Sequence, residues 1–159
     1  MKAQTKICLP IFLICLCYPA TFGQQSDNAV IDKFIALQAR RENGSEPDGV
    51  RQVATGDLNH DGIPDAAVLY TIEGQNGSNN YIQYLAVFVR TKGRLVYAAR
   101  KPVGGKNHRA LDLDSVKDNL MFFDTTDYAK TDPSCCPTIK GTTRFVLNAG
   151  TIREMSHRK

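Results

Sequence analysis

The stretch Gly56–Asp65 (Gly-Asp-Leu-Asn-His-Asp-Gly-Ile-Pro-Asp) carries an oxygen-bearing side chain at every second position, followed by a glycine and a further acid. This alternation lets three side chains curl around one point and offer their oxygens to a hard cation. Gly62 permits the sharp turn that such a loop needs, because glycine adopts backbone angles that other residues resist. The candidate metal ligands are the side chains of Asp57, Asn59, Asp61 and Asp65 and the backbone carbonyl of Ile63.

Calcium is the cation that this set of ligands favours. It takes about six to eight oxygen ligands in irregular geometry, whereas magnesium requires a regular octahedron and zinc prefers nitrogen and sulfur. The spacing departs from that of an EF-hand, because Val68 stands at the twelfth place from Asp57, where an EF-hand carries a bidentate glutamate. We therefore expect a structural calcium site. The alternative is an Asx-rich turn between two strands that binds no metal.

The pattern Asp-x-Asn-x-Asp-Gly-x-x-Asp resembles the calcium loops of FG-GAP and related extracellular β-repeats. The apolar run 66–70 follows the last acid at once, which indicates a loop followed by a strand. The pattern occurs once in this chain, whereas a β-propeller would repeat it. The resemblance therefore implies calcium binding by the loop and does not imply the propeller fold.

Residues 1–23 have the features of a secretory signal peptide. Two lysines precede an apolar run over 7–18, and the stretch that ends at Gly23 offers small residues for cleavage. The apolar run is too short for a transmembrane helix. We expect a secreted or periplasmic protein with no membrane span after cleavage, and a single domain over residues 24–159, because this length favours one domain.

The charge of the chain does not point to a polyanionic partner. Cleavage after Gly23 would remove two of the 20 basic residues and none of the 16 acidic ones, so the formal charge would fall from +4 to +2. So small a charge gives no reason to expect binding to nucleic acid or to an anionic membrane. The basic residues are scattered, and we interpret those from Lys101 to Arg109 as a solvated loop.

Three of the five cysteines, Cys8, Cys15 and Cys17, lie in the predicted signal peptide. The remaining two, Cys135 and Cys136, are adjacent. Such a pair can form a vicinal disulfide, stay reduced or pair with another chain. Because thiols tend to be oxidised in an oxidising compartment, we expect the vicinal disulfide. The chain has no Cys-x-x-Cys spacing, so we do not expect redox catalysis.

Helical periodicity covers 27–42, where Ser26 or Asp27 can cap the start. The apolar stripe of this helix consists of Val30, Ile31, Phe34, Ile35, Leu37 and Gln38. Short runs separated by turn residues then predict strands at 50–55, 66–72, 81–91, 94–99, 109–116, 120–126, 142–147 and 151–155. Short connections favour antiparallel neighbours. The predicted fold class is α+β, with the N-terminal helix packed on a meandering, mainly antiparallel sheet of about seven or eight strands.

No catalytic motif is present. The histidines are far apart, and the sequence lacks a Gly-x-Ser-x-Gly elbow, a P-loop and a His-Glu-x-x-His pair. We therefore expect a protein that is not an enzyme. Asp112 and Asp114 share one face of the strand 109–116, which we interpret as its solvent face.

Two other functions remain as alternatives. An envelope hydrolase that uses surface carboxylates would need two carboxyl groups about 5–9 Å apart, at least one of them with a raised pKa. A calcium sensor or buffer is disfavoured by the missing glutamate at Val68. The acids available to a hydrolase are Asp112, Asp114, Asp124, Asp127 and Asp132.

The order of features along the chain resembles that of a group of small bacterial periplasmic proteins. The resemblance rests on the signal peptide, the helix, the calcium loop, the strand that contains 84–89 (Tyr-Leu-Ala-Val-Phe-Val) and the late segment 132–138 (Asp-Pro-Ser-Cys-Cys-Pro-Thr). Some relatives of this organisation are immunity proteins that inhibit peptidoglycan-cleaving effectors. The resemblance implies a non-enzymatic protein that binds another envelope protein, with a cell-wall hydrolase as the candidate partner. We expect the loops 73–80 and 129–141 to form its contact surface.

Overall fold

The computed structural model of this chain describes residues 22–155. Its first element is helix α1 (Phe22–Arg41), which begins earlier than the predicted helix, 27–42. Ser26 and Asp27 both lie inside the helix, so neither is the N-cap that we expected. Asp27 forms an ion pair with Arg90 instead.

The predicted signal peptide lies outside the described residues, apart from its last two, which begin α1. Within the described part of the chain, no helix is long and apolar enough to cross a membrane.

Eight strands follow α1, each antiparallel to the next and in the same order in the sheet as in the sequence. The predicted α+β fold, with one helix and a meandering sheet, is confirmed, and strands dominate the described residues. The predicted strand limits differ most at β4, which runs on to Gly105, and at β7, which begins at Ile139. The strands are β1 (Gln52–Gly56), β2 (Asp65–Glu73), β3 (Tyr81–Thr91), β4 (Arg94–Gly105), β5 (Arg109–Lys117), β6 (Leu120–Asp127), β7 (Ile139–Asn148) and β8 (Thr151–Met155).

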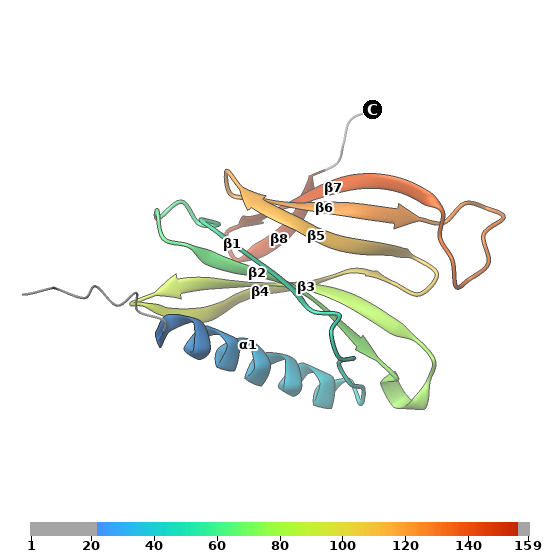
Figure 1. Ribbon diagram of the computed structural model, residues 1–159, viewed down its shortest axis with the longest axis horizontal. Coiled ribbons are helices and arrows are strands. Elements are labelled where there is room, and N and C mark those ends of the chain that lie inside the picture. The colour runs from blue at the N-terminus through green and yellow to red at the C-terminus, as the bar shows by residue number, and fades with distance from the viewer. Residues whose placement is uncertain (1–21, 156–159) are drawn as a thin grey trace, which may run out of the picture.

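The sheet divides between β4 and β5, which share only the residue pair Gly105 and Arg109. Gly105 has a φ of +144°, and a Cβ atom there would lie 2.6 Å from the carbonyl oxygen of Tyr81. Glycine is therefore required where the chain leaves the first half of the sheet. β5 then lies against β1, and β8 lies against β4. Figure 1 shows three layers, which are α1, strands β1–β4 and strands β5–β8. We did not predict this division of the sheet.

Two apolar cores hold the layers together. In the first, Ile31 and Ile35 of α1 lie against strand residues such as Tyr70 and Phe88, and all four are buried. Burying one such aliphatic side chain contributes about 1.5–3 kcal/mol. Leu37, which we expected in the apolar stripe, is 45% exposed. The second core joins the two halves of the sheet and consists of Leu58, Ala67, Leu69, Leu85, Val87, Ala99, Val103, Leu111, Met121, Phe123, Phe145 and Ile152.

The basic segment from Lys101 to Arg109 is not the solvated loop that we expected. Lys101 lies within β4, and Arg109 begins β5. The Arg109 guanidinium donates hydrogen bonds to both carboxylate oxygens of Glu154, at 2.7 and 2.9 Å. These bonds hold the pKa of the Glu154 carboxyl below its usual range. Only the short turn 106–108 between the two strands matches the prediction.

The loop 73–80 contains a 3-10 turn, Gln75–Gly77, and is tied to the end of α1. The backbone N–H of Asn76 donates to the carbonyl of Asn43 at 3.0 Å, and the Asn43 amide donates to the Asn76 side-chain oxygen at 3.0 Å. The loop 73–80, which we predicted to be a contact surface, therefore has a defined conformation beside the end of α1.

Candidate functional site

The predicted calcium loop connects β1 to β2. The pairing of the two strands ends at Gly56 and Asp65, so the loop spans 57–64 and its two ends lie side by side. His60 and Gly62 both adopt positive φ angles, of 65° and 77°, which turn the chain back on itself. The loop is therefore a closed turn at the tip of a hairpin, and most of its side chains are exposed.

Asp57 organises the loop through its carboxylate. Its Oδ1 atom accepts hydrogen bonds from the backbone N–H groups of Asn59 and Asp61, both at 3.2 Å. Its Oδ2 atom accepts one from the N–H of Gly62 at 2.9 Å. The Gly62 hydrogen bond is the main reason that the pKa of the Asp57 carboxyl lies below its usual value. The group is therefore ionised at neutral pH and available to a cation.

Asn59 and Asp61 lie beside Asp57. The Asn59 amide donates to Asp61 Oδ2 at 2.9 Å, and its oxygen accepts the N–H of Asp61 at 3.0 Å. Asp61 Oδ1 accepts the N–H of Ile63 at 2.8 Å. The structure thus brings three of the predicted side-chain ligands together, with the backbone of Ile63 next to them.

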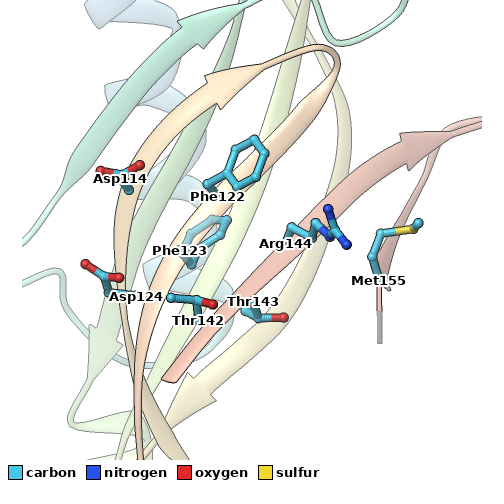
Figure 2. Close-up of a pocket in the computed structure, with 8 residues that line it drawn as sticks. All are labelled: Asp114, Phe122, Phe123, Asp124, Thr142, Thr143, Arg144 and Met155. Carbon is cyan, nitrogen blue, oxygen red and sulfur yellow. The ribbon is translucent and has the colours of Figure 1, made fainter. Parts of the chain in front are cut away.

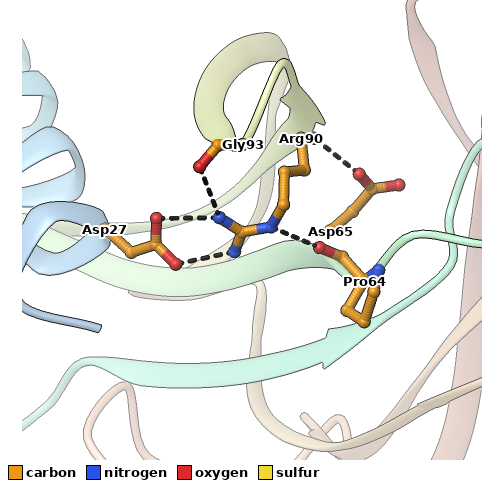
Figure 3. Close-up of polar contacts among 5 residues, drawn as sticks. All are labelled: Asp27, Pro64, Asp65, Arg90 and Gly93. Carbon is orange, nitrogen blue, oxygen red and sulfur yellow. Dashed lines mark hydrogen bonds and ion pairs between the residues drawn. The ribbon is translucent and has the colours of Figure 1, made fainter. Parts of the chain in front are cut away.

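Asp65 has a different environment. It is fully buried, and its Oδ2 accepts the backbone N–H of Leu58 at 3.0 Å. Its Oδ1 accepts the backbone N–H of Arg90 at 2.7 Å (Figure 3). A carboxylate has about four acceptor positions, so these bonds leave each oxygen able to accept once more. Asp65 fastens the end of the loop to β3, and its role as a metal ligand stays a prediction.

The Arg90 side chain holds the same corner of the fold together. Its guanidinium donates to both carboxylate oxygens of Asp27 on α1, at 3.1 and 2.6 Å. It also donates to the carbonyl oxygens of Pro64, at 3.0 Å, and of Gly93, at 3.4 Å (Figure 3). Arg90 therefore joins the helix, the loop and β3. Sequence reasoning missed this residue, and its only signal was a basic residue near the end of an apolar strand.

The candidate ligands in this loop are all oxygens, the kind of ligand that a hard cation takes. No described lysine or arginine forms a salt bridge with Asp57 or Asp61. Within residues 22–155, no group of three or more His, Cys, Asp and Glu side chains could hold a metal by itself. A metal in this loop would therefore also need the oxygens of Asn59 and of the Ile63 carbonyl. A cation bound there would offset the repulsion between the two carboxylates and stabilise the hairpin.

The acids proposed for a hydrolase do not form one site. Asp112 and Asp124 are opposite each other on β5 and β6, and Asp114 lies at a bulge in β5. Asp114 and Asp124 line a shallow pocket of about 230 Å³ (Figure 2). All three acids are exposed on the open face of the sheet, as we expected for Asp112 and Asp114. The other residues that line the pocket are Phe122, Phe123, Thr142, Thr143, Arg144 and Met155.

Asp132 lies apart from these acids, in the loop between β6 and β7. Its Oδ2 atom accepts the backbone N–H groups of Ala129 and Thr138, at 2.8 and 2.9 Å, and the Ala129 bond is the main reason that its pKa is lowered. Cys135 and Cys136 in the same loop are bonded to each other, with an S–S distance of 2.33 Å. Asp132 therefore shapes the loop that carries the disulfide.

No family model matches the chain, and neither the curated proteins nor the solved structures give a significant match. The inference about function therefore depends on the residues and the geometry described above.

Proposed function

We propose that this chain is a secreted or periplasmic protein that binds Ca²⁺ in the loop 57–65 and acts, without catalysis, by binding another envelope protein. The observation that carries the calcium proposal is the arrangement of Asp57, Asn59 and Asp61. Their side chains meet in one exposed turn, and backbone N–H groups hold both carboxylates in place. The metal has a structural role, because it would fix a hairpin whose end Asp65 already joins to β3.

The surface that we propose for the partner is the outer face of β5–β8, which no other described element covers (Figure 1). Asp112, Asp114 and Asp124 gather there, and no described lysine or arginine forms a salt bridge with them. Asp112 and Asp124 are opposite each other, and like charges so placed in a sheet are destabilising. Arg144 also lines the pocket but forms no salt bridge with Asp114 or Asp124, so the acids still favour a cationic occupant. The exposed Met155 and the half-buried Phe122 beside the pocket suit the aliphatic stem of a basic side chain.

The partner is accordingly a protein with a basic loop, and a cell-wall hydrolase is the candidate. The loop 129–141, which leads into β7, extends this contact surface. The loop 73–80 lies beside the end of α1 instead and is not part of this face. An inhibitor needs no catalytic group of its own, which agrees with the exposed, open setting of the three acids. The hydrolase alternative would require a desolvated carboxyl group as its acid.

Thermal unfolding in EDTA and in millimolar calcium tests the metal site. Free calcium at about a hundred times the dissociation constant of the site stabilises the fold by about 2.7 kcal/mol. For a domain of this size, that raises the melting temperature by roughly 6–12 °C. Asp61→Ala should abolish the rise, and Asp48→Ala, which removes an exposed acid from another loop, should keep it. An equal rise in melting temperature in all three proteins, or no rise in the wild type, would exclude the loop as a calcium site.

Binding to purified lysozyme-type hydrolases and inhibition of their activity test the partner. We expect Asp124→Lys to weaken binding by about tenfold or more, because it places a cation where the partner's basic side chain would lie. Asp48→Lys makes the same charge change away from this face and should leave binding unchanged. If no hydrolase is bound or inhibited, the inhibitor proposal must be abandoned.

A further inference from the structure

The disulfide between Cys135 and Cys136 should contribute little to the stability of the fold. The two residues are neighbours, with Cα atoms 3.8 Å apart. A disulfide stabilises a protein mainly by restricting the unfolded chain, and the effect grows with the number of residues that the bond encloses. This bond encloses none, so it leaves the unfolded chain almost as free as before.

The loop around the disulfide is held in shape by other contacts. Asp132 Oδ2 accepts the backbone N–H groups of Ala129 and Thr138, and Asp132 Oδ1 accepts the Thr138 hydroxyl at 3.0 Å. The Tyr128 hydroxyl donates to the carbonyl of Ser134 at 2.8 Å. None of these bonds involves sulfur. The loop base should therefore keep its shape whether the cysteines are oxidised or reduced.

Both cysteines are exposed to solvent, as are Pro133 and Ser134 before them. The loop that carries them connects β6 to β7 and projects beyond the ends of the strands (Figure 1). An external thiolate can therefore approach either sulfur without any opening of the fold. Accessible disulfides of this kind exchange readily, whereas buried structural ones do not.

We propose that Cys135 and Cys136 form a reversible thiol–disulfide exchange site whose co-reactant is a small or protein-borne dithiol. A thiolate of the dithiol attacks one Sγ atom, the S–S bond breaks, and the other cysteine leaves as a thiolate that takes up a proton. The second thiolate of the co-reactant then attacks the mixed disulfide and releases the first cysteine. The protein gains two electrons and two protons, and the dithiol becomes a disulfide. This inference does not depend on calcium, and its test needs no partner, although the proposed contact surface includes the same loop.

The reduced site would be a vicinal dithiol on a loop of unchanged shape. Two neighbouring thiols bind a trivalent arsenical together, with two As–S bonds formed and one water released from phenylarsine oxide. A single thiol holds the same reagent weakly and loses it to a competing monothiol. Phenylarsine oxide is therefore a probe that distinguishes a reduced pair from one accessible cysteine.

The experiment uses folded residues 24–159, in which Cys135 and Cys136 are the only cysteines. It reduces this protein with dithiothreitol and removes the dithiothreitol, which would itself bind the arsenical. It then adds phenylarsine oxide in the presence of a monothiol and measures the intact mass. We expect one arsenical per chain, a circular dichroism spectrum equal to that of the untreated protein, and a melting temperature within about 2 °C of the oxidised form. Cys135→Ser should keep the fold and fail to retain the arsenical. Asp132→Asn should still bind it but should melt at a lower temperature.

Two results would overturn the proposal. One is a disulfide that is reduced only after the protein is unfolded in denaturant, since the bond would then be protected. The other is a loss of the native spectrum when the bond is reduced, since the bond would then maintain the fold. The double variant Cys135→Ser, Cys136→Ser distinguishes the second result from damage by the reagents, because it should be folded without any treatment.

Discussion

The side-chain amide of Gln83 on β3 forms two hydrogen bonds with the backbone of Leu111 on β5. Its nitrogen donates to the Leu111 carbonyl at 3.0 Å, and its oxygen accepts the Leu111 N–H at 2.8 Å. Gln52 on β1 makes a related contact, since its oxygen accepts the backbone N–H of Leu113 and its nitrogen donates to the side-chain carboxylate of Asp112. The two glutamines form hydrogen bonds with backbone groups on the edge of β5 that lacks a continuous neighbouring strand. They also join the two halves of the sheet.

We predict that Gln83→Ala lowers the free energy of unfolding by about 1–3 kcal/mol, because it leaves two backbone groups of Leu111 without partners. Gly104→Ala should have a similar effect, because a Cβ atom there would lie 2.6 Å from the Gln83 side-chain oxygen. Urea unfolding measures both changes. Thr55→Ala, at an exposed position on β1, is the matched control and should change stability by less than about 0.5 kcal/mol.

The helix and strands could be predicted because their signals are local. The run 81–91, for example, is apolar and bounded by turn residues, and it forms β3 as predicted. The division into two layers could not be predicted, because it depends on contacts between distant residues such as Gln83 and Leu111. No spacing in the sequence indicates that a glutamine side chain will bond to the backbone of a strand in place of a neighbouring strand.

The same contrast applies to the calcium loop. The ligand spacing from Asp57 to Asp61 lies within a few residues, and the structure brings these side chains together. The partner of Asp65 is the backbone of Arg90, far along the chain, and the pairing follows from the register of β2 with β3. The sequence therefore identified these acids, but it could not show that Asp61 is exposed whereas Asp65 is buried and bonded to the backbone.

We predict that Asp65 and Asp61 contribute to stability in different ways. In EDTA, Asp65→Ala should lower the free energy of unfolding by about 2–4 kcal/mol, because it leaves the N–H groups of Leu58 and Arg90 buried and unpaired. Asp61→Ala should change it by less than about 1 kcal/mol, since its side chain is exposed. Chemical denaturation in EDTA compares the two variants. Equal losses would mean that Asp61 also has a structural role without metal.

A third prediction concerns the ion pair between Arg90 and Asp27, whose side chains are 20% and 12% exposed. Arg90→Gln should destabilise the protein by about 1.5–3 kcal/mol, because it removes charge-assisted hydrogen bonds from a partly buried carboxylate. The double variant with Asp27→Asn should be less destabilised than the sum of the two single variants, since it leaves no unpaired charge. A double-mutant cycle of urea unfolding measures the coupling, and additive effects would contradict it.

Tyr70 makes the stability of this protein sensitive to alkaline pH. Its ring is fully buried, and burial raises the pKa of its hydroxyl from 10.0 to about 12, although the Arg100 side chain favours ionisation. The folded state therefore keeps this proton at a pH where the unfolded chain releases it. The contribution to stability is complete below about pH 10 and is lost as the pH rises to about 12.

We predict that the free energy of unfolding falls by up to about 2–3 kcal/mol more in the wild type than in Tyr70→Phe across this pH range, because one pKa unit corresponds to about 1.36 kcal/mol. Urea unfolding at a series of pH values measures the difference. Tyr97→Phe removes a hydroxyl from a residue that is 46% exposed and should follow the wild-type curve. Parallel curves for the wild type and Tyr70→Phe would show that the buried hydroxyl does not control alkaline unfolding.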